Sequence, residues 1–543
     1  MAPRPRRPLG RVALTAFLSA GTAAAVEPWS DNDPAEPPTR HEFDDYGLTA
    51  SAEYRANWSY VNPIALNGAR NRRASFIEHR LRLDTAVDYD ETVAIALSID
   101  GLNGTLWGDN ATFGEPAANA GVRGATSNPN NVKPAIGYQA GDPLDPDSYG
   151  YVLVPSELLQ LRRAYGEVAT SIGLFRIGRQ PAIDGTEILF ADGDGRPNRF
   201  GYSNDGDSSD RILFATKPLE VVKSVDQRDP SRDRGLFFAI AYDRVASSEI
   251  RTFGDDLDGV ASLLRYLDPR PAQRRTLELQ AMYLYRWQRQ FDTDLHVFEV
   301  LAQGSVERFS VGFEGVHIGG GTRQIAETLA RLQPAQPVER QSIDQWGARA
   351  VARWDEPAWT AYLEFDFASG DADPDPSTPL SQMNWAPDSN VGLLMFERIL
   401  AFESARSAGS NSALLQTLGA PPDAAAFVAT QGAFTNALTI FPQFDLRPID
   451  EILFRSGVLM AWTAADLVDP ISSLSSGELV NYNGGKPGNF YGVELDGRFQ
   501  WRYEEHFLFD LEAALLFPGN AFEDENGDAS RSVLVQGRTT FAF

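Results

Sequence analysis

Apolar and polar residues alternate along most of the chain after residue 47, in segments of ten residues or more. Between residues 48 and 60, Tyr54 and Trp58 share one face with small apolar residues, whereas Glu53 and Arg55 share the other. Successive side chains of a β-strand point to opposite faces, so this period of two predicts strands. The same scheme recurs at 77–89, 93–100, 346–354, 359–367, 491–503 and 507–517.

The length of these segments favours a membrane barrel over a soluble sheet. Strands of globular proteins average about five or six residues, whereas a strand that crosses a bilayer needs about nine to eleven. Trp, Tyr and Phe stand at the ends of the apolar faces, as in the aromatic girdles of membrane barrels. The pattern predicts an all-β fold, a transmembrane antiparallel up-and-down β-barrel with apolar residues outside and charged residues inside. A soluble β-sheet protein is the alternative.

The C-terminal segment, Ser532 to Phe543, strengthens this prediction. It alternates strictly and ends on an aromatic residue, with Phe541 and Phe543 on the same face as Val533. This ending is typical of the last strand of bacterial outer-membrane barrels. Such a strand must pair with the first one, because an open edge cannot be solvated in lipid.

The predicted connections alternate between short turns and long polar stretches, as expected for short periplasmic turns and long extracellular loops. Both termini should lie on the periplasmic side, so the number of strands must be even. We expect 18 strands if Leu257–Leu267 is a strand, and 16 if 294–318 is a single long one. We favour 18, because Asp294–Gln303 and Arg308–Ile318 each have the length of a strand. The connection Pro218–Arg234 is unusually long for a periplasmic turn.

The two ends of the chain set the expected domains. Arg4, Arg6, Arg7 and Arg11 precede a short apolar run and an A-x-A cleavage site, which is typical of a signal peptide over residues 1–25. Residues 26–46 are then an N-terminal periplasmic segment. Residues 47–543 form the barrel, with loops 103–156 and 370–434 as large insertions.

Composition excludes some functions. The 48 Lys and Arg against 74 Asp and Glu give a net charge of −26, which argues against nucleic acid as a partner. The chain has no cysteine for disulfides or metal clusters, and its five histidines lie in no motif of a hydrolase. We therefore expect no enzyme and no cofactor. Calcium in acidic loops such as 192–194, 204–207, 371–375 and 523–528 is a possibility left open.

Four motifs carry a family resemblance. LRRAYGEV at 161–168 followed by LFRIGRQP at 174–181 resembles the "RQAY-E … GRQ" hairpin of the alginate-export outer-membrane family. ASGDADP at 368–374, GVELD at 492–496 and FPGNAF at 517–522 resemble its "SGD-DP", "G-ELD" and "FPG-AF" segments. Residues 204–214 are similar to uncharacterised porin-like barrels instead. The resemblance implies an 18-stranded monomeric porin in the outer membrane of a Gram-negative bacterium, whose arginine-rich lumen conducts a polyanionic polysaccharide.

Alternation also predicts which charged residues line the lumen. Arg179 breaks the inward parity set by Arg176, and we expect a β-bulge at Gly178 to return it to the lumen. Opposite charges on neighbouring strands could instead pair and simply fill the barrel. The predicted pore-lining residues are Arg55, Arg80, Arg82, Arg162, Arg176, Arg179, Arg349, Arg353, Glu364, Asp366, Glu494, Asp496, Arg498 and Arg502.

These observations predict a porin-like channel for the passive passage of polar or anionic solutes. Export of an acidic, alginate-like polysaccharide is the first alternative, and a structural or adhesive barrel without transport is the second. The expected partners are outer-membrane lipid, the solute (a uronate polysaccharide in the first alternative) and the barrel-assembly machinery. Whether 385–430 folds into the pore or lies outside is left open.

Overall fold

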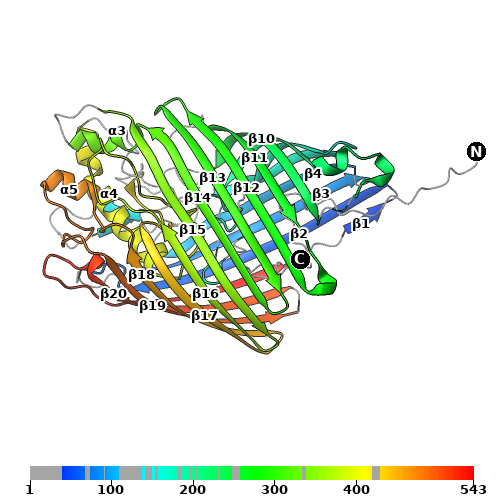
Figure 1. Cartoon of the computed structure of the whole chain (residues 1–543). Helices are drawn as coiled ribbons and strands as arrows, with labels where there is room; N and C mark the ends of the chain where they lie inside the picture. Colours follow the sequence, from blue (N-terminus) through cyan, green and yellow to red (C-terminus); the bar gives the residue numbers. More distant parts are fainter. Residues whose placement is uncertain are drawn as a thin grey trace, which may run out of the picture.

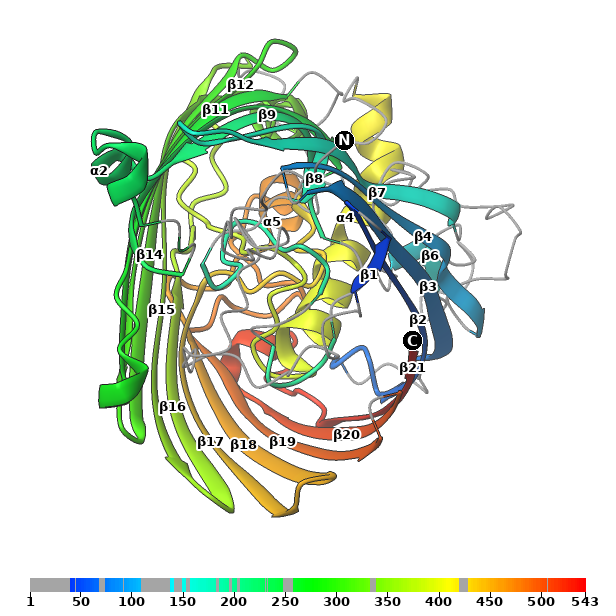
Figure 2. The same ribbon diagram turned by 90° about the vertical axis from the view of Figure 1, so that its right-hand side faces the viewer.

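Eighteen long antiparallel strands form a closed barrel in the computed structural model (Figures 1 and 2). The structure describes residues 40–543 except 44, 68–73, 91, 109–136, 141–148, 153–156, 182–184, 195–197, 203–205, 230, 232, 248–256, 333–337, 419–427 and 505. The barrel strands are β2 (Tyr46–Asn62), β3 (Ala74–Tyr89), β4 (Val93–Gly108), β7 (Glu157–Ala169), β8 (Leu174–Pro181), β9 (Ser208–Thr216), β10 (Gly235–Ser247), β11 (Asp258–Leu267), β12 (Arg275–Gln288), β13 (Thr293–Val306), β14 (Phe309–Thr322), β15 (Gln341–Glu356), β16 (Trp359–Ala368), β17 (Ala437–Ile449), β18 (Ile452–Thr463), β19 (Phe490–Tyr503), β20 (Phe507–Pro518) and β21 (Ser532–Ala542).

The last strand closes the barrel on the first. β21 pairs with β2 from Glu53↔Ala542 to Asn62↔Val533, so neither strand leaves its edge open along this stretch. A further short strand, β1 (Arg40–Phe43), pairs with the part of β2 that extends beyond the end of β21. The prediction of 18 barrel strands is confirmed. That number required Leu257–Leu267 to be a strand, and β11 covers this segment.

The two faces of the barrel wall differ as the alternation predicts. Large apolar side chains such as Ile95, Phe298 and Leu438 are exposed on the outside, where the lipid lies. Charged side chains at the intervening positions, such as Arg349 and Asp366, are buried inside. A helix long and apolar enough to cross a membrane does not occur among the described residues.

The connections differ between the two ends of the barrel (Figure 1). At the end that holds the C-terminus, most connections are tight turns, but the β9–β10 connection carries α2 (Pro218–Val221) and η1 (Val225–Gln227). We take this end as periplasmic. The remaining short elements are η2 (Pro271–Gln273), α3 (Ala326–Leu329), η3 (Ala330–Leu332), η4 (Met395–Leu400), α4 (Ala401–Thr417), α5 (Pro470–Ser476), η6 (Asn520–Phe522) and the hairpin of β5 (Gly137–Ala140) and β6 (Tyr149–Val152).

Two long connections fold into the barrel. Figure 2 shows that parts of the β8–β9 loop, together with η4 and the first turns of α4, lie within the ring of strands. An apolar cluster that includes Trp385, Phe396 and Phe434 packs these segments against wall residues such as Tyr491. The first part of 385–430, through η4 and the first turns of α4, therefore folds into the barrel, whereas the rest of α4 packs against α3, α5 and the β5–β6 hairpin. The predicted signal peptide and most of loop 103–156 lie outside the described residues.

Candidate functional site: the charged lumen and the loops that cross it

The inner wall carries ion pairs between neighbouring strands. Arg455 of β18 lies opposite Asp445 of β17 and donates two hydrogen bonds of 2.6 Å to its carboxylate. Both side chains are fully buried, so each charge depends on the other for compensation. Other pairs of the same kind include Arg82–Asp100 at 2.7 Å, Arg176–Glu167 at 2.6 Å, Arg349–Asp366 at 2.9 Å and Arg498–Asp510 at 2.7 Å.

A β-bulge turns two consecutive arginines of β7 toward the lumen. The register between β4 and β7 shifts between Ser98 and Ile99, where the backbone pairing passes from Arg163 to Leu161 and skips Arg162. Arg162 and Arg163 both reach the β8–β9 loop as a result, since a bulge reverses the alternation of side chains. Arg162 donates to the carbonyl of Gly206 at 2.9 Å, and Arg163 lies 3.4 Å from the carboxylate of Asp194.

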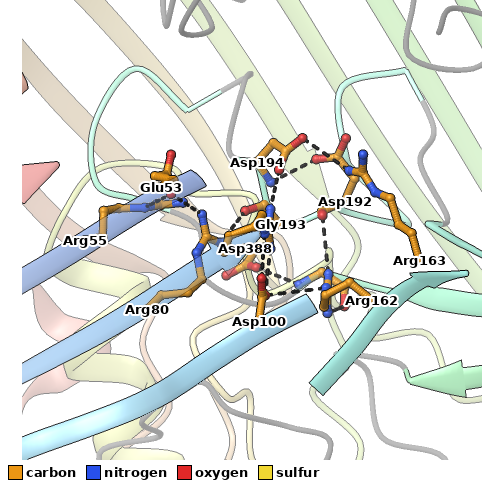
Figure 3. A network of polar contacts seen from close by, with 12 residues as sticks. Glu53, Arg55, Arg80, Asp100, Arg162, Arg163, Asp192, Gly193, Asp194 and Asp388 are labelled. Atoms are coloured by element: carbon orange, nitrogen blue, oxygen red, sulfur yellow. Dashed lines mark hydrogen bonds and ion pairs between the residues drawn. The ribbon is translucent and has the colours of Figure 1, made fainter. Parts of the chain in front are cut away.

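The tip of the β8–β9 loop lies in a network of charges on β2, β3, β4 and β7 (Figure 3). Arg80 donates to the carbonyl of Gly193 at 3.0 Å and to Glu53 at 2.7 Å. Arg82 bridges Asp100 and Asp194, which it contacts at 2.7 and 2.5 Å. The side chains of Glu53, Asp194 and Arg163 keep 32%, 28% and 25% of their surface exposed, more than other members of the network. This network is therefore where a solute inside the barrel can meet fixed charge.

The rest of the β8–β9 loop is fixed to the opposite wall. Thr186 donates its N–H to Glu314 at 2.5 Å and accepts from Arg349 at 3.0 Å. The carbonyl of Arg199 accepts from both Arg455, at 2.6 Å, and Arg498, at 3.0 Å. The Arg199 side chain forms an ion pair with Glu364 and donates to Gln443 at 2.7 Å. The described parts of this loop thus span the lumen between β3 and β18.

The β16–β17 connection is held by one wall carboxylate and by apolar contacts. Glu494 of β19 accepts hydrogen bonds from the N–H groups of Leu393, Leu394 and Met395 at 2.7, 2.8 and 2.7 Å. These amides precede or begin η4, and amides at the start of a helix have no partner within the helix. The guanidinium of Arg349 lies 4.7 Å from the centre of the Trp385 ring, which joins this connection to the wall.

Two loop carboxylates outside the strands have a raised pKa. Asp469 caps the N-terminus of α5, and it accepts from Ile471, Ser472 and, at 2.6 Å, the hydroxyl of Ser407 in α4. Burial raises the pKa of Asp469 above its usual value, against the opposing effect of these hydrogen bonds. Burial likewise raises the pKa of Asp371.

The structure places most of the predicted lumen residues inside the barrel. Their role in conduction stays a prediction. Arg353 and Arg502 are half-buried near the periplasmic turns. The other residues of this set are buried inside the wall: Arg55, Arg80, Arg82, Arg162, Arg176, Arg349, Glu364, Asp366, Glu494, Asp496 and Arg498.

The prediction that Arg179 faces the lumen is wrong. The register of β8 with both neighbours runs through Gly178 without a shift, so the predicted bulge is not there. Arg179 therefore keeps the outward parity of Ile177 and pairs on the outer face with Asp210, at 2.9 Å. The bulge lies on the neighbouring strand β7, at Arg162.

The sequence analysis missed several residues of the lumen. Arg455 and Asp445 follow the same alternation as the predicted set, so their strands contained the signal. Arg163 could not be found by parity, because the bulge beside it reverses the alternation. Asp194 and Arg199 lie in a loop, where no period exists to indicate which way a side chain points.

The acidic loops proposed for calcium are engaged in other contacts. Asp194 pairs with Arg82 and Arg163, and Asp371 accepts hydrogen bonds from Asp373 and Ser381 in its own connection. In the part of the chain that the structure describes, no group of three or more His, Asp or Glu side chains is arranged to hold a metal ion. The expectation of no cofactor stays a prediction, with calcium as the alternative that the sequence left open.

A family model described as "Alginate export" matches residues 154–536, more than half of the chain. The chain belongs to the alginate-export family. It is an outer-membrane β-barrel of the Gram-negative type, as the resemblance of its four motifs implied. No protein of curated function matches its sequence.

Solved structures of outer-membrane proteins share the fold. OccAB1 of Acinetobacter baumannii is 9% identical, with a TM-score of 0.50, and the match covers 94% of this chain and 99% of that one. OccK11 (OpdR) of Pseudomonas aeruginosa is also 9% identical, with a TM-score of 0.45 and coverage of 91% and 96%. At this identity the first likeness supports the barrel architecture alone.

Proposed function

We propose that the protein is a porin-like channel through which small polar or anionic solutes pass without energy input. The observation that carries the proposal is the mixed charge of the lumen. Its buried arginines are compensated by carboxylates of the same wall, as in Arg455–Asp445, whereas Glu53, Asp194 and Arg163 stay partly exposed to the interior. Opposed charges at close range orient a polar solute and select it by charge and size.

Export of an acidic polysaccharide is the second candidate, and membership of the alginate-export family favours it. A polyanion that threads the lumen requires arginines that can exchange their partners for uronate groups. The pairing of the wall arginines weighs against such exchange, because opening a buried pair costs about 3–5 kcal/mol. The two inward connections also occupy much of the path that a chain would take (Figure 2).

Recordings from single channels in planar bilayers separate these candidates. The porin proposal expects discrete current steps through the wild-type protein that long guluronate oligomers block no better than neutral oligosaccharides of the same length. Block by guluronate at concentrations at which the neutral oligomer has no effect would replace the proposal with polysaccharide export. Absence of current in a correctly assembled, heat-modifiable barrel would leave a structural or adhesive role.

The charge reversal Arg176→Glu is a poor variant for this test. Arg176 is buried against Glu167 and lies 4.6 Å from the centre of the Tyr165 ring. A second carboxylate there would face Glu167 without compensation, so assembly would fail before selectivity could be measured.

A further inference from the structure

The β9–β10 connection displays three large apolar side chains to solvent close together in the sequence. Leu219, Val222 and Val225 are 60%, 83% and 71% exposed. They lie on α2, directly after it and at the start of η1. A periplasmic turn in water gains nothing from exposing three large apolar residues so close together, which points to a surface that covers them.

Hydrogen bonds hold this connection in one shape. Arg228 donates to the carbonyls of Val221 and Lys223 at 2.8 and 3.1 Å. Lys217 donates to the carbonyls of Asp229 and Ser231 at 3.2 and 2.9 Å. The apolar residues therefore lie on a segment whose backbone shape is fixed by hydrogen bonds.

The connection lies beside the outer surface of the barrel. Figure 2 shows α2 outside the ring of strands. Arg228 also donates to the carbonyl of Ser171 in the β7–β8 turn, and Thr216 donates to the carbonyl of Ile172 at 2.7 Å. Ile172 is half-exposed and is followed by Phe175 and Ile177 on the lipid-facing side of β8. The apolar tip thus continues the surface that the wall presents to lipid.

The charge of the connection suits a phospholipid surface. Residues 217–234 contain five basic and four acidic residues and have a net charge of +1, although the chain carries −26. Two of the four lysines of the chain, Lys217 and Lys223, are in this stretch. Phosphate headgroups therefore do not repel it as they repel the rest of the protein.

We propose that the β9–β10 connection is an interfacial segment that lies in the periplasmic leaflet of the outer membrane, with Leu219, Val222 and Val225 inserted among the lipid headgroups. Interfacial segments of this kind bury apolar side chains at the boundary of headgroups and acyl chains and keep basic residues near the phosphates. This interfacial segment fixes the depth and tilt of the barrel in the membrane on the side of β8 to β10.

The absence of natural cysteines allows a direct test. Val222→Cys is labelled with an environment-sensitive fluorophore in the full-length protein, in nanodiscs of phosphatidylethanolamine and phosphatidylglycerol. Ile212→Cys on the lipid-facing side of β9 is the membrane reference, and Glu478→Cys in an exposed stretch of the β18–β19 loop is the water reference. Iodide quenches from water on both faces of a nanodisc, and lipids with a shallow spin label quench from the membrane.

We expect Val222→Cys to behave like Ile212→Cys, with quenching by the spin-labelled lipid and several-fold less quenching by iodide than at position 478. Quenching by iodide equal to that at position 478, with no effect of the lipid quencher, would overturn the proposal and point to a periplasmic protein as the partner. Each labelled variant must first show heat-modifiable mobility, so that only assembled barrels are compared.

Discussion

The two connections that enter the lumen are held there by different means. The β8–β9 loop is held through its backbone: Gly193, Thr186 and Arg199 offer carbonyls to arginines of the wall. The β16–β17 connection is held mainly by an apolar cluster, in which the ring of Phe396 lies 4.9 Å from that of Phe434 and 5.5 Å from that of Tyr491.

The difference explains what much of the lumen charge is for. A loop that leaves water must find partners for its peptide groups, because an unpaired buried peptide group costs about as much as a lost hydrogen bond. Wall arginines supply donors to the β8–β9 loop, and Glu494 supplies acceptors to the β16–β17 connection. Ion pairs along the strands hold both kinds of side chain in place. In the proposed channel, selection of a solute would therefore rest on the few half-exposed charges.

Loss of a wall arginine should have the largest effect. Arg455→Ala removes the nearest cation from the buried Asp445, which is left with the more distant Arg447 at 3.6 Å, and it removes one donor from the Arg199 carbonyl. We expect a loss of about 3–5 kcal/mol in the free energy of unfolding, measured with urea in lipid vesicles. The matched variant Arg455→Met with Asp445→Leu replaces the pair by apolar groups and should recover most of this loss. A single variant as stable as the wild type would show that the wall pair does not hold the loop.

Truncation in the apolar cluster should loosen the β16–β17 connection alone. Phe396 is 2% exposed, and we expect Phe396→Ala to cost about 3 kcal/mol, the lower end for a buried Phe because a loop can relax. That corresponds to about a hundredfold larger open population of the connection. Limited proteolysis should cut there faster while the barrel keeps its heat-modifiable mobility. Phe298→Ala on the lipid-facing side is the control, and equal cleavage in both variants would contradict local loosening.

Alternation was sufficient to predict the barrel. Its period of two is a property of each strand, so the 18 strands and the inward direction of residues such as Arg349 could be obtained one segment at a time. Closure also followed from the sequence, because lipid leaves no alternative for the edges of the first and last strands.

The site was less predictable, because it depends on breaks in that period. The bulge at Arg162 reverses the parity of Arg163, and nothing in the local sequence distinguishes it from the bulge that we expected at Gly178. The direction of the β8–β9 loop is set by contacts with distant strands, such as Arg199 with Glu364 and Gln443. The apolar residues of 385–404 indicated burial, but not what would cover them.

A smaller effect is expected where the β16–β17 connection meets the β18–β19 loop. Asp469 caps α5 and accepts from Ser407 of α4, so Asp469→Ala should cost about 1 kcal/mol. The pKa of Asp469 is higher in the folded protein than in the unfolded chain. Binding of the proton therefore stabilises the fold fully at pH values below the unfolded pKa. This contribution is lost as the pH rises through the folded pKa. Asp469→Asn keeps an acceptor and cannot ionise, so it should remove the pH dependence. Hydrogen exchange of α4 and α5 between pH 4 and 7 measures both, and an unchanged pH dependence in Asp469→Asn would exclude this carboxyl as its source.

The smallest effect concerns selectivity, and one hairpin provides both variant and control. Arg163 of β7 faces the lumen, whereas Arg179 of β8 lies on the outer face with Asp210. Arg163→Gln removes a lumen cation that is 25% exposed. A unit charge about 8 Å from a passing ion in water contributes about 0.5 kcal/mol, with opposite sign for a cation and an anion. The ratio of cation to anion permeability should therefore rise about fivefold. Arg179→Gln should leave the reversal potential unchanged in a salt gradient, because the wall of the barrel separates Arg179 from the ion path. A shift in Arg179→Gln as large as that in Arg163→Gln would place Arg179 in the lumen after all and would restore the bulge at Gly178.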